Sequence, residues 1–189
     1  MRHLTPADYT TMPWANGRGT TTELIRVDGA GGLRWRLSLA SVVEDGPFSI
    51  FPGIERNLTV IAGPGFDLVG TGIALQARAL VPIAFPGDVA LRAVGTLGAT
   101  SDDFNVMTAR SLPKPQVTVA HGGAVLAVGG TLCLFALGPV AVNGTGVARH
   151  DLVITAGGAT VDGRWPLAGD RGAAGGLNRG LCPRTPGVF

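Results

Sequence analysis

Histidine is the residue type whose spacing would most directly indicate a metal site in this sequence. The 189 residues include only His3, His121 and His150, which lie far apart and form no His-x-His pair. A metal ion needs several nitrogen or carboxylate ligands that converge on one point. The sequence therefore predicts no metal site and no cofactor, and it places His3 beside a terminus that we expect to fray.

Serine and cysteine also lack the surroundings of a catalytic nucleophile. No serine lies in a Gly-x-Ser-x-Gly elbow, and Cys133 and Cys182 are far apart with no Cys-x-x-Cys motif. This pattern argues against a serine or cysteine hydrolase. Because residues 1–16 contain no apolar run of signal-peptide length, we expect a cytoplasmic protein with reduced thiols.

Two acidic pairs, Glu44-Asp45 and Asp102-Asp103, are the candidates for acid–base chemistry. Neighbouring side chains of a strand point to opposite faces, so neither pair brings two carboxylates together. We interpret Glu44, Asp45 and Asp102 as solvated residues of turns. Asp103 differs from them, because residues 103, 105 and 107 share one face of an alternating strand whose other face is apolar.

Arginine, which can bind a carboxylate through two parallel hydrogen bonds, dominates the basic residues. Fourteen arginines and Lys114 are set against thirteen acidic residues, and the net charge of +2 is spread along the chain. That distribution argues against nucleic-acid binding. A high-GC coding bias is the simpler explanation for the excess of arginine, so composition alone assigns no binding site.

The elements that must position these residues are short strands. Thirty glycines, thirteen prolines and only 15% charged residues favour strands joined by tight turns. Residues 33–40 alternate between apolar and polar side chains, which places Arg36 and Ser38 on one face. Turns rich in glycine and proline separate further strand candidates at 58–61, 66–69, 73–81, 89–93 and 104–110. We therefore predict an all-β sandwich or barrel.

Pro113-Lys114-Pro115 interrupts this series of strands and marks a boundary. We predict a first half at residues 1–112, a second β half at 113–162 that completes the fold, and a partly mobile tail at 163–189. Residues 122–142 carry no charge and are long enough to span a bilayer. Glycine and proline cut this run into strand-length pieces without a flanking aromatic belt, so we expect no membrane association.

Three segments, taken together, resemble the HutD/Ves family. Each segment is modest alone, but their order and spacing make a specific match that ends near Arg110, with Trp35 to Ala40 between the first two. The matching segments are MPWANGRG at 12–19, followed by Thr20 and Glu23, DGPFSIFPG at 45–53, followed by Arg56, and DFNVM at 103–107.

The resemblance implies a cupin-like β-barrel or sandwich, as a bicupin of two fused β halves, and an association with histidine utilisation. The family is thought to limit that pathway by binding an intermediate such as formylglutamate or urocanate. We therefore expect a regulatory protein whose partner is a small anionic metabolite. The concave mouth of such a fold is lined by alternate strand residues, which here need no metal.

Arginine and amide donors that converge in this mouth would suit a carboxylate with a polar tail. Solvated or ion-paired arginines and plain core aromatics are the ordinary alternatives for these residue types. From the matched segments and the alternating strands we expect ligand binding by Asn16, Arg36, Ser38, Ser49, Arg56, Asp103, Asn105 and Arg110, and a pocket wall of Trp14, Phe51 and Met107.

Two other functions stay open. A metal-independent cupin enzyme, an isomerase or hydrolase acting on a small carboxylic acid, would use Asp103 or Glu23 as its base, and a carboxylate of perturbed pKa facing the arginines would favour it. A stress-associated structural or interaction protein with a vestigial pocket would instead show an exposed apolar patch. An exposed edge strand would make a homodimer easy to form without requiring one.

Overall fold

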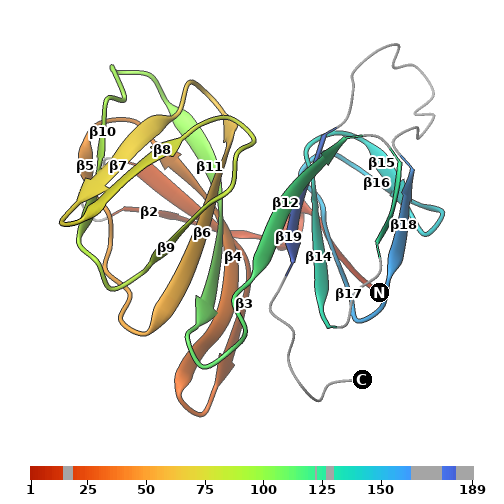
Figure 1. The fold of residues 1–189 in the computed structure, drawn as a ribbon. Helices are drawn as coiled ribbons and strands as arrows, with labels where there is room; N and C mark the ends of the chain where they lie inside the picture. The colour runs from red at the N-terminus through yellow and green to blue at the C-terminus, as the bar shows by residue number, and fades with distance from the viewer. Residues whose placement is uncertain (15–18, 122, 127–129, 163–175, 182–189) are drawn as a thin grey trace. The chain divides into compact units, whose positions relative to one another are not determined.

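Strands make up almost all of the regular secondary structure in the computed structural model of this protein (Figure 1). The structure describes residues 1–14, 19–121, 123–126 and 130–162, and the backbone of 176–181. Within these residues the sole helical element is the short 3-10 helix η1 (Pro6–Asp8). The predicted all-β class is confirmed.

The chain divides into two compact units, and the described residues of each unit form two sheets. The first unit, Tyr9–Lys114, contains β2 (Thr10–Pro13), β3 (Gly19–Gly29), β4 (Gly32–Val42), β5 (Gly46–Pro47), β6 (Ile54–Ala62), β7 (Phe66–Gly70), β8 (Ile73–Ala77), β9 (Ile83–Pro86), β10 (Leu91–Val94) and β11 (Ser101–Ala109). The second unit consists of residues 1–8 and the chain from Pro115 onwards. It contains β1 (Arg2–Leu4), β12 (Gln116–His121), β13 (Ala124–Leu126), β14 (Leu132–Ala136), β15 (Val140–Val142), β16 (Thr145–Val147), β17 (Leu152–Thr155), β18 (Ala159–Asp162) and β19 (Gly176–Leu181).

The N-terminal residues belong to the second unit, because β1 pairs antiparallel with β17. Leu4 in this strand is buried, and His3 Nε2 lies 2.8 Å from Asp151 Oδ2. The terminus that we expected to fray is therefore a paired strand. These residues also fall outside the unit that carries the family motifs, although we placed them in a first half at 1–112.

The first unit buries its core between a six-stranded sheet, β2-β3-β4-β11-β6-β9, and a four-stranded sheet, β5-β10-β7-β8. Leu58 of β6 and Leu68 of β7 are fully buried members of this core. The predicted turn at 63–65 joins the two sheets. Gly65 adopts a φ of 84°, and a Cβ atom there would lie 2.1 Å from the carbonyl oxygen of Ala77, so only glycine fits.

The strand predicted at 73–81 is shorter in the structure and ends at Ala77. Leu80 has a φ of 61°, in the left-handed region, and a strand cannot continue through that conformation. The chain then resumes as β9, which pairs with β6 at the edge of the six-stranded sheet.

The uncharged run at 122–142 contributes strands to the second unit. Its described residues include β13, β14 and β15, whose apolar side chains enter the core of that unit, with Leu132, Val140 and Val142 fully buried. In the described part of the chain, no helix has the length and apolar character that a membrane span requires.

The predicted tail contains β19, which pairs with β12 on one side and β14 on the other. Backbone hydrogen bonds to two strands therefore hold residues 176–181 in the five-stranded sheet of the second unit. The remainder of the prediction for 163–189 falls outside the described residues.

Replacing Leu4 with alanine tests whether β1 stabilises the second unit. We expect Leu4→Ala to lower the free energy of unfolding by about 2–3 kcal/mol, because it removes buried methyl groups and leaves a cavity. Urea denaturation followed by circular dichroism measures the change. Met12→Ala is the control, since Met12 is exposed on β2, and equal stability of the two variants would show that β1 frays.

Candidate functional site

One face of the six-stranded sheet carries polar side chains across three neighbouring strands. The antiparallel register places Arg36 of β4 opposite Met107 of β11, and Ser38 opposite Asn105. On the other side of β11, Arg56 of β6 also lies opposite Met107. Because side chains alternate between the two faces of a strand, these residues point to the same side of the sheet.

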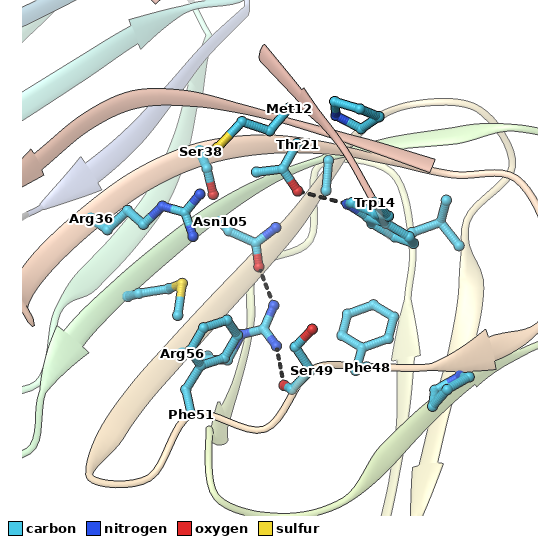
Figure 2. A pocket seen from close by; sticks show the side chains of 15 residues that line it. Met12, Trp14, Thr21, Arg36, Ser38, Phe48, Ser49, Phe51, Arg56 and Asn105 are labelled. Atoms are coloured by element: carbon cyan, nitrogen blue, oxygen red, sulfur yellow. Dashed lines mark hydrogen bonds between the residues drawn. The ribbon is translucent and has the colours of Figure 1, made fainter. Parts of the chain in front are cut away.

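This face lines a cavity of about 430 Å³ within the first unit. Binding sites for small molecules have volumes of roughly 300–1,000 Å³, so the cavity has room for a metabolite. Figure 2 shows the guanidinium groups of Arg36 and Arg56 pointing toward its interior, with Asn105 between them. The predicted residues that line it are Trp14, Arg36, Ser38, Ser49, Phe51, Arg56, Asn105 and Met107.

Arg56 is a buried cation in the wall of this cavity, with 7% of its surface exposed. Its Nη2 donates a 2.8 Å hydrogen bond to Asn105 Oδ1, and its Nη1 lies 3.5 Å from the carbonyl oxygen of Ser49 (Figure 2). The Nε atom has no hydrogen-bond partner among the described residues. The guanidinium therefore bonds to a neutral amide and, at a long distance, to one backbone oxygen.

Three phenylalanine rings form an aromatic cage around the guanidinium of Arg56. The Cζ atom lies 5.3 Å from the ring centroid of Phe48, 5.4 Å from that of Phe51 and 5.0 Å from that of Phe85. The faces of aromatic rings attract a cation, most strongly where water is excluded. Because the rings offer no conventional acceptor, the cage holds the charge in place without occupying its N–H donors.

Asn105 links Arg56 to Asp103, which is fully buried and is not among the cavity-lining residues. The Nδ2 atom of Asn105 donates to Asp103 Oδ1, while its Oδ1 accepts from Arg56. These two contacts fix the orientation of the amide, because the reverse orientation would oppose donor to donor. In the described part of the chain, Asp103 Oδ2 has no hydrogen-bond partner.

Burial raises the pKa of Asp103 to about 7, because the ionised carboxylate is poorly solvated there. The charge of Arg56 and the hydrogen bond from Asn105 limit this rise, while the neighbouring Asp102 adds to it. Burial also lowers the pKa of Arg56 to about 10, which leaves its guanidinium charged at neutral pH. The cavity therefore keeps its cation while the nearby carboxylate titrates near neutrality.

Arg36 brings a second guanidinium to the cavity from β4. Its Nε atom lies 2.7 Å from Oε2 of Glu23 on β3, so the two side chains form an ion pair. The N–H group does not point at the carboxylate oxygen well enough to make a hydrogen bond. The side chains of Arg36 and Glu23 are 12% and 24% exposed. A poorly aligned pair is weaker than a bidentate one, and arginine has five N–H donors, so Arg36 retains donors for another anion.

Trp14 and Thr21 form another part of the cavity wall. Trp14 Nε1 donates a 2.8 Å hydrogen bond to Thr21 Oγ1, which fixes the indole ring (Figure 2). A Cβ atom at Gly19 would lie 2.9 Å from the indole Cε3 atom and 2.5 Å from the carbonyl oxygen of Ser41. Glycine at position 19 therefore lets the tryptophan lie against the strand.

Two of the described residues that we predicted to bind the ligand, Asp103 and Arg110, are not in the lining of the cavity. Asp103 is fully buried next to Asn105 on β11, and Asn16 lies outside the described residues. Arg110 donates hydrogen bonds of 2.8 and 3.0 Å to Asp88 and of 2.8 Å to Glu55. It lines a second cavity, of about 550 Å³, that shares Arg36 and Phe51 with the first.

Sequence reasoning missed two rings of the aromatic cage. Phe48 lies inside the segment 45–53 that carries the resemblance, so that motif contained a usable signal. Phe85 reaches Arg56 because β9 pairs with β6 and places the two residues opposite each other. No local spacing in the sequence indicates that pairing.

Metal ligands do not gather in the described part of the chain, where no three His, Cys, Asp or Glu side chains are placed to hold an ion together. His3 pairs with Asp151, and the ring of His150 stacks on Phe135 at a centroid distance of 5.7 Å. The groups that the cavity offers to a ligand are guanidinium, amide, hydroxyl and aromatic groups.

Two curated relatives match part of this chain. An uncharacterised 21.2 kDa protein in the hutC 3′ region of Pseudomonas putida is 40% identical over 111 residues, which cover 56% of this chain and 57% of that protein. Protein Ves of Citrobacter koseri is 34% identical over 128 residues, which cover 62% of this chain and 67% of that protein. This chain thus aligns with little more than half the length of the Pseudomonas putida relative.

Solved structures extend the similarity over nearly the whole chain. HutD from Pseudomonas fluorescens SBW25 superimposes with a TM-score of 0.81 at 28% identity, over 97% of this chain and 99% of that one. A cupin 2 conserved barrel domain protein from Leptotrichia buccalis gives 0.53 at 8% identity, over 87% and 89%. The second likeness concerns the fold alone, and the fold of this protein is cupin-like. Because the HutD family model matches residues 6–169, this chain belongs to the HutD family.

Proposed function

We propose that this protein binds a small carboxylate in the cavity around Arg56 and regulates histidine utilisation through that binding. The observation that supports this function is a buried, charged guanidinium that is hydrogen-bonded to a neutral amide rather than directly to a carboxylate. An ionised ligand oxygen would accept the N–H groups that the aromatic cage leaves available. Hydrogen bonds between charged groups are stronger than those between neutral ones.

The remaining lining residues favour an acid with a polar tail. Arg36 supplies a second cation, and Ser38 supplies a hydroxyl group next to the amide of Asn105. Trp14 and Phe51 offer apolar surface for a short carbon chain. Formylglutamate and urocanate, two intermediates of histidine breakdown, have this combination of groups, and the names of the relatives associate the family with that pathway.

A metal-independent enzyme acting on a small acid is the second candidate, and the raised pKa of Asp103 favours it. A general base must reach the proton that it removes, directly or through one water molecule. Asp103 has no exposed surface and is not among the residues that line the cavity, while Glu23 is paired with Arg36. Binding without chemistry is therefore the better supported function.

A thermal-shift screen of the EDTA-treated protein tests the choice of ligand. We expect formylglutamate or urocanate to raise the melting temperature selectively, because a ligand that binds only the native state stabilises it. Glutamate and divalent metal ions serve as comparisons in the same screen. A shift with metal ions alone would contradict the proposed carboxylate site, and so would the absence of any shift.

Replacing either Arg56 or Arg36 should weaken binding of the acid that raises the melting temperature in the thermal-shift screen. We expect Arg56→Ala to abolish detectable binding, and Arg36→Ala to raise the Kd about 10- to 100-fold, the equivalent of one charged hydrogen bond at about 1.5–3 kcal/mol. Isothermal titration calorimetry measures both. Arg36→Ala keeps the test decisive if the buried Arg56 proves necessary for folding.

Arg110→Ala is the matched control for this pair of variants. It removes the same charge from the same unit, but Arg110 is engaged with Asp88 and Glu55 and does not line the cavity. Its Kd should equal that of the unmodified protein. Equal affinity in the Arg56 and Arg110 variants would remove Arg56 from the site.

A further inference from the structure

Asp103 is a buried acid that simple ligand binding does not require. It has no exposed surface, it has no hydrogen-bond partner at Oδ2 among the described residues, and one amide group separates it from Arg56. A charged ligand bound at Arg56 would therefore lie close enough to Asp103, across the amide of Asn105, to change its protonation.

The charged groups around Asp103 come from each neighbouring strand. Arg56 lies on β6, Asp102 is adjacent on β11, and Arg36 on β4 is itself paired with Glu23 of β3. Before a ligand arrives, Arg56 is the charge that most favours the ionised form of Asp103. Any anion bound to Arg56 opposes that influence.

We propose that the cavity takes up one proton together with its anion, and that Asp103 is the group that binds this proton. This inference rests on the proposed function. An anion beside Arg56 offsets the guanidinium charge and repels the carboxylate that is hydrogen-bonded to Asn105, so the neutral acid becomes the stable form. The proton comes from solvent and joins Oδ2, while Oδ1 continues to accept from Asn105.

The coupling makes affinity depend on pH near neutrality. The pKa of Asp103 is about 7 in the empty cavity, so the carboxylate is mostly ionised at pH 8. Binding above pH 7 must then include protonation, and the apparent affinity should fall by up to tenfold for each unit of rising pH. Below pH 6 Asp103 is already protonated, and the affinity should be nearly constant.

Calorimetry with formylglutamate at pH 8, in phosphate and in Tris buffer, measures the protons taken up. Both carboxyl groups of this probe are ionised there, so uptake reports on the protein. We expect nearly one proton per bound ligand in the unmodified protein and none in Asp103→Asn. Asp102→Asn is the matched control, since Asp102 accepts a hydrogen bond from Ser41 Oγ, and it should keep the uptake.

Carbon-13 NMR of the aspartate carboxyl groups provides a second readout, which needs no variant at position 103. The pKa of Asp103 should rise when the probe saturates the protein. A binding heat that is the same in both buffers, or an unchanged titration of Asp103, would overturn the proton coupling and leave the proposed function intact. Failure of the probe to bind between pH 6 and 8 would instead contradict the proposed ligand.

A folded Asp103→Asn variant that still takes up a proton would assign the uptake to another group. If that variant does not fold, the NMR titration of the unmodified protein decides between the two outcomes.

Discussion

The guanidinium of Arg56 carries a full positive charge and has almost no contact with water. The residues packed around it in the first unit must therefore stabilise that charge. A buried charge is costly unless other groups replace the water that it loses. Here the faces of three phenylalanine rings and the amide of Asn105 surround the guanidinium. The carboxylate of Asp103, which is hydrogen-bonded to the other end of that amide, also contributes. A direct Arg56–Asp103 ion pair would satisfy both charges and leave little attraction for a ligand. The intervening Asn105 keeps the opposite charge at a distance, so the guanidinium is held without being neutralised.

The two sheets of the first unit position this arrangement. The polar row of Arg36, Ser38 and Asn105 lies on the central strands, while the apolar core packs close by against the four-stranded sheet. The cupin 2 protein from Leptotrichia buccalis shares the fold at 8% identity, so similar strands carry different side chains there. A fold of this kind positions a cavity, and the residues on alternate strand positions determine what the cavity can bind.

Local patterns predicted the class of fold and much of the cavity. Alternation at 33–40 and 103–107 placed Arg36, Ser38 and Asn105 correctly on shared faces, because side-chain alternation is a property of each strand alone. The depth of Asp103, the approach of Phe85 and the end of β8 at Ala77 depend on contacts between distant segments. Arg110 was also predicted to bind the ligand, yet Asp88 and Glu55 accept its hydrogen bonds outside the lining of the first cavity.

The pairing of β1 with β17 gives the chain a nested order. Residues 9–114 form a unit inserted between two parts of another unit, and the hydrogen bond from His3 to Asp151 spans 148 positions. A ribosome therefore completes the inserted unit long before it makes the partner of the first strand. Domains fold as units in the order of their synthesis, so the inserted unit is free to fold first. The second unit completes its fold last, because β1 cannot pair until β17 has been synthesised. Until then the apolar side chain of Leu4 lacks its partner strand.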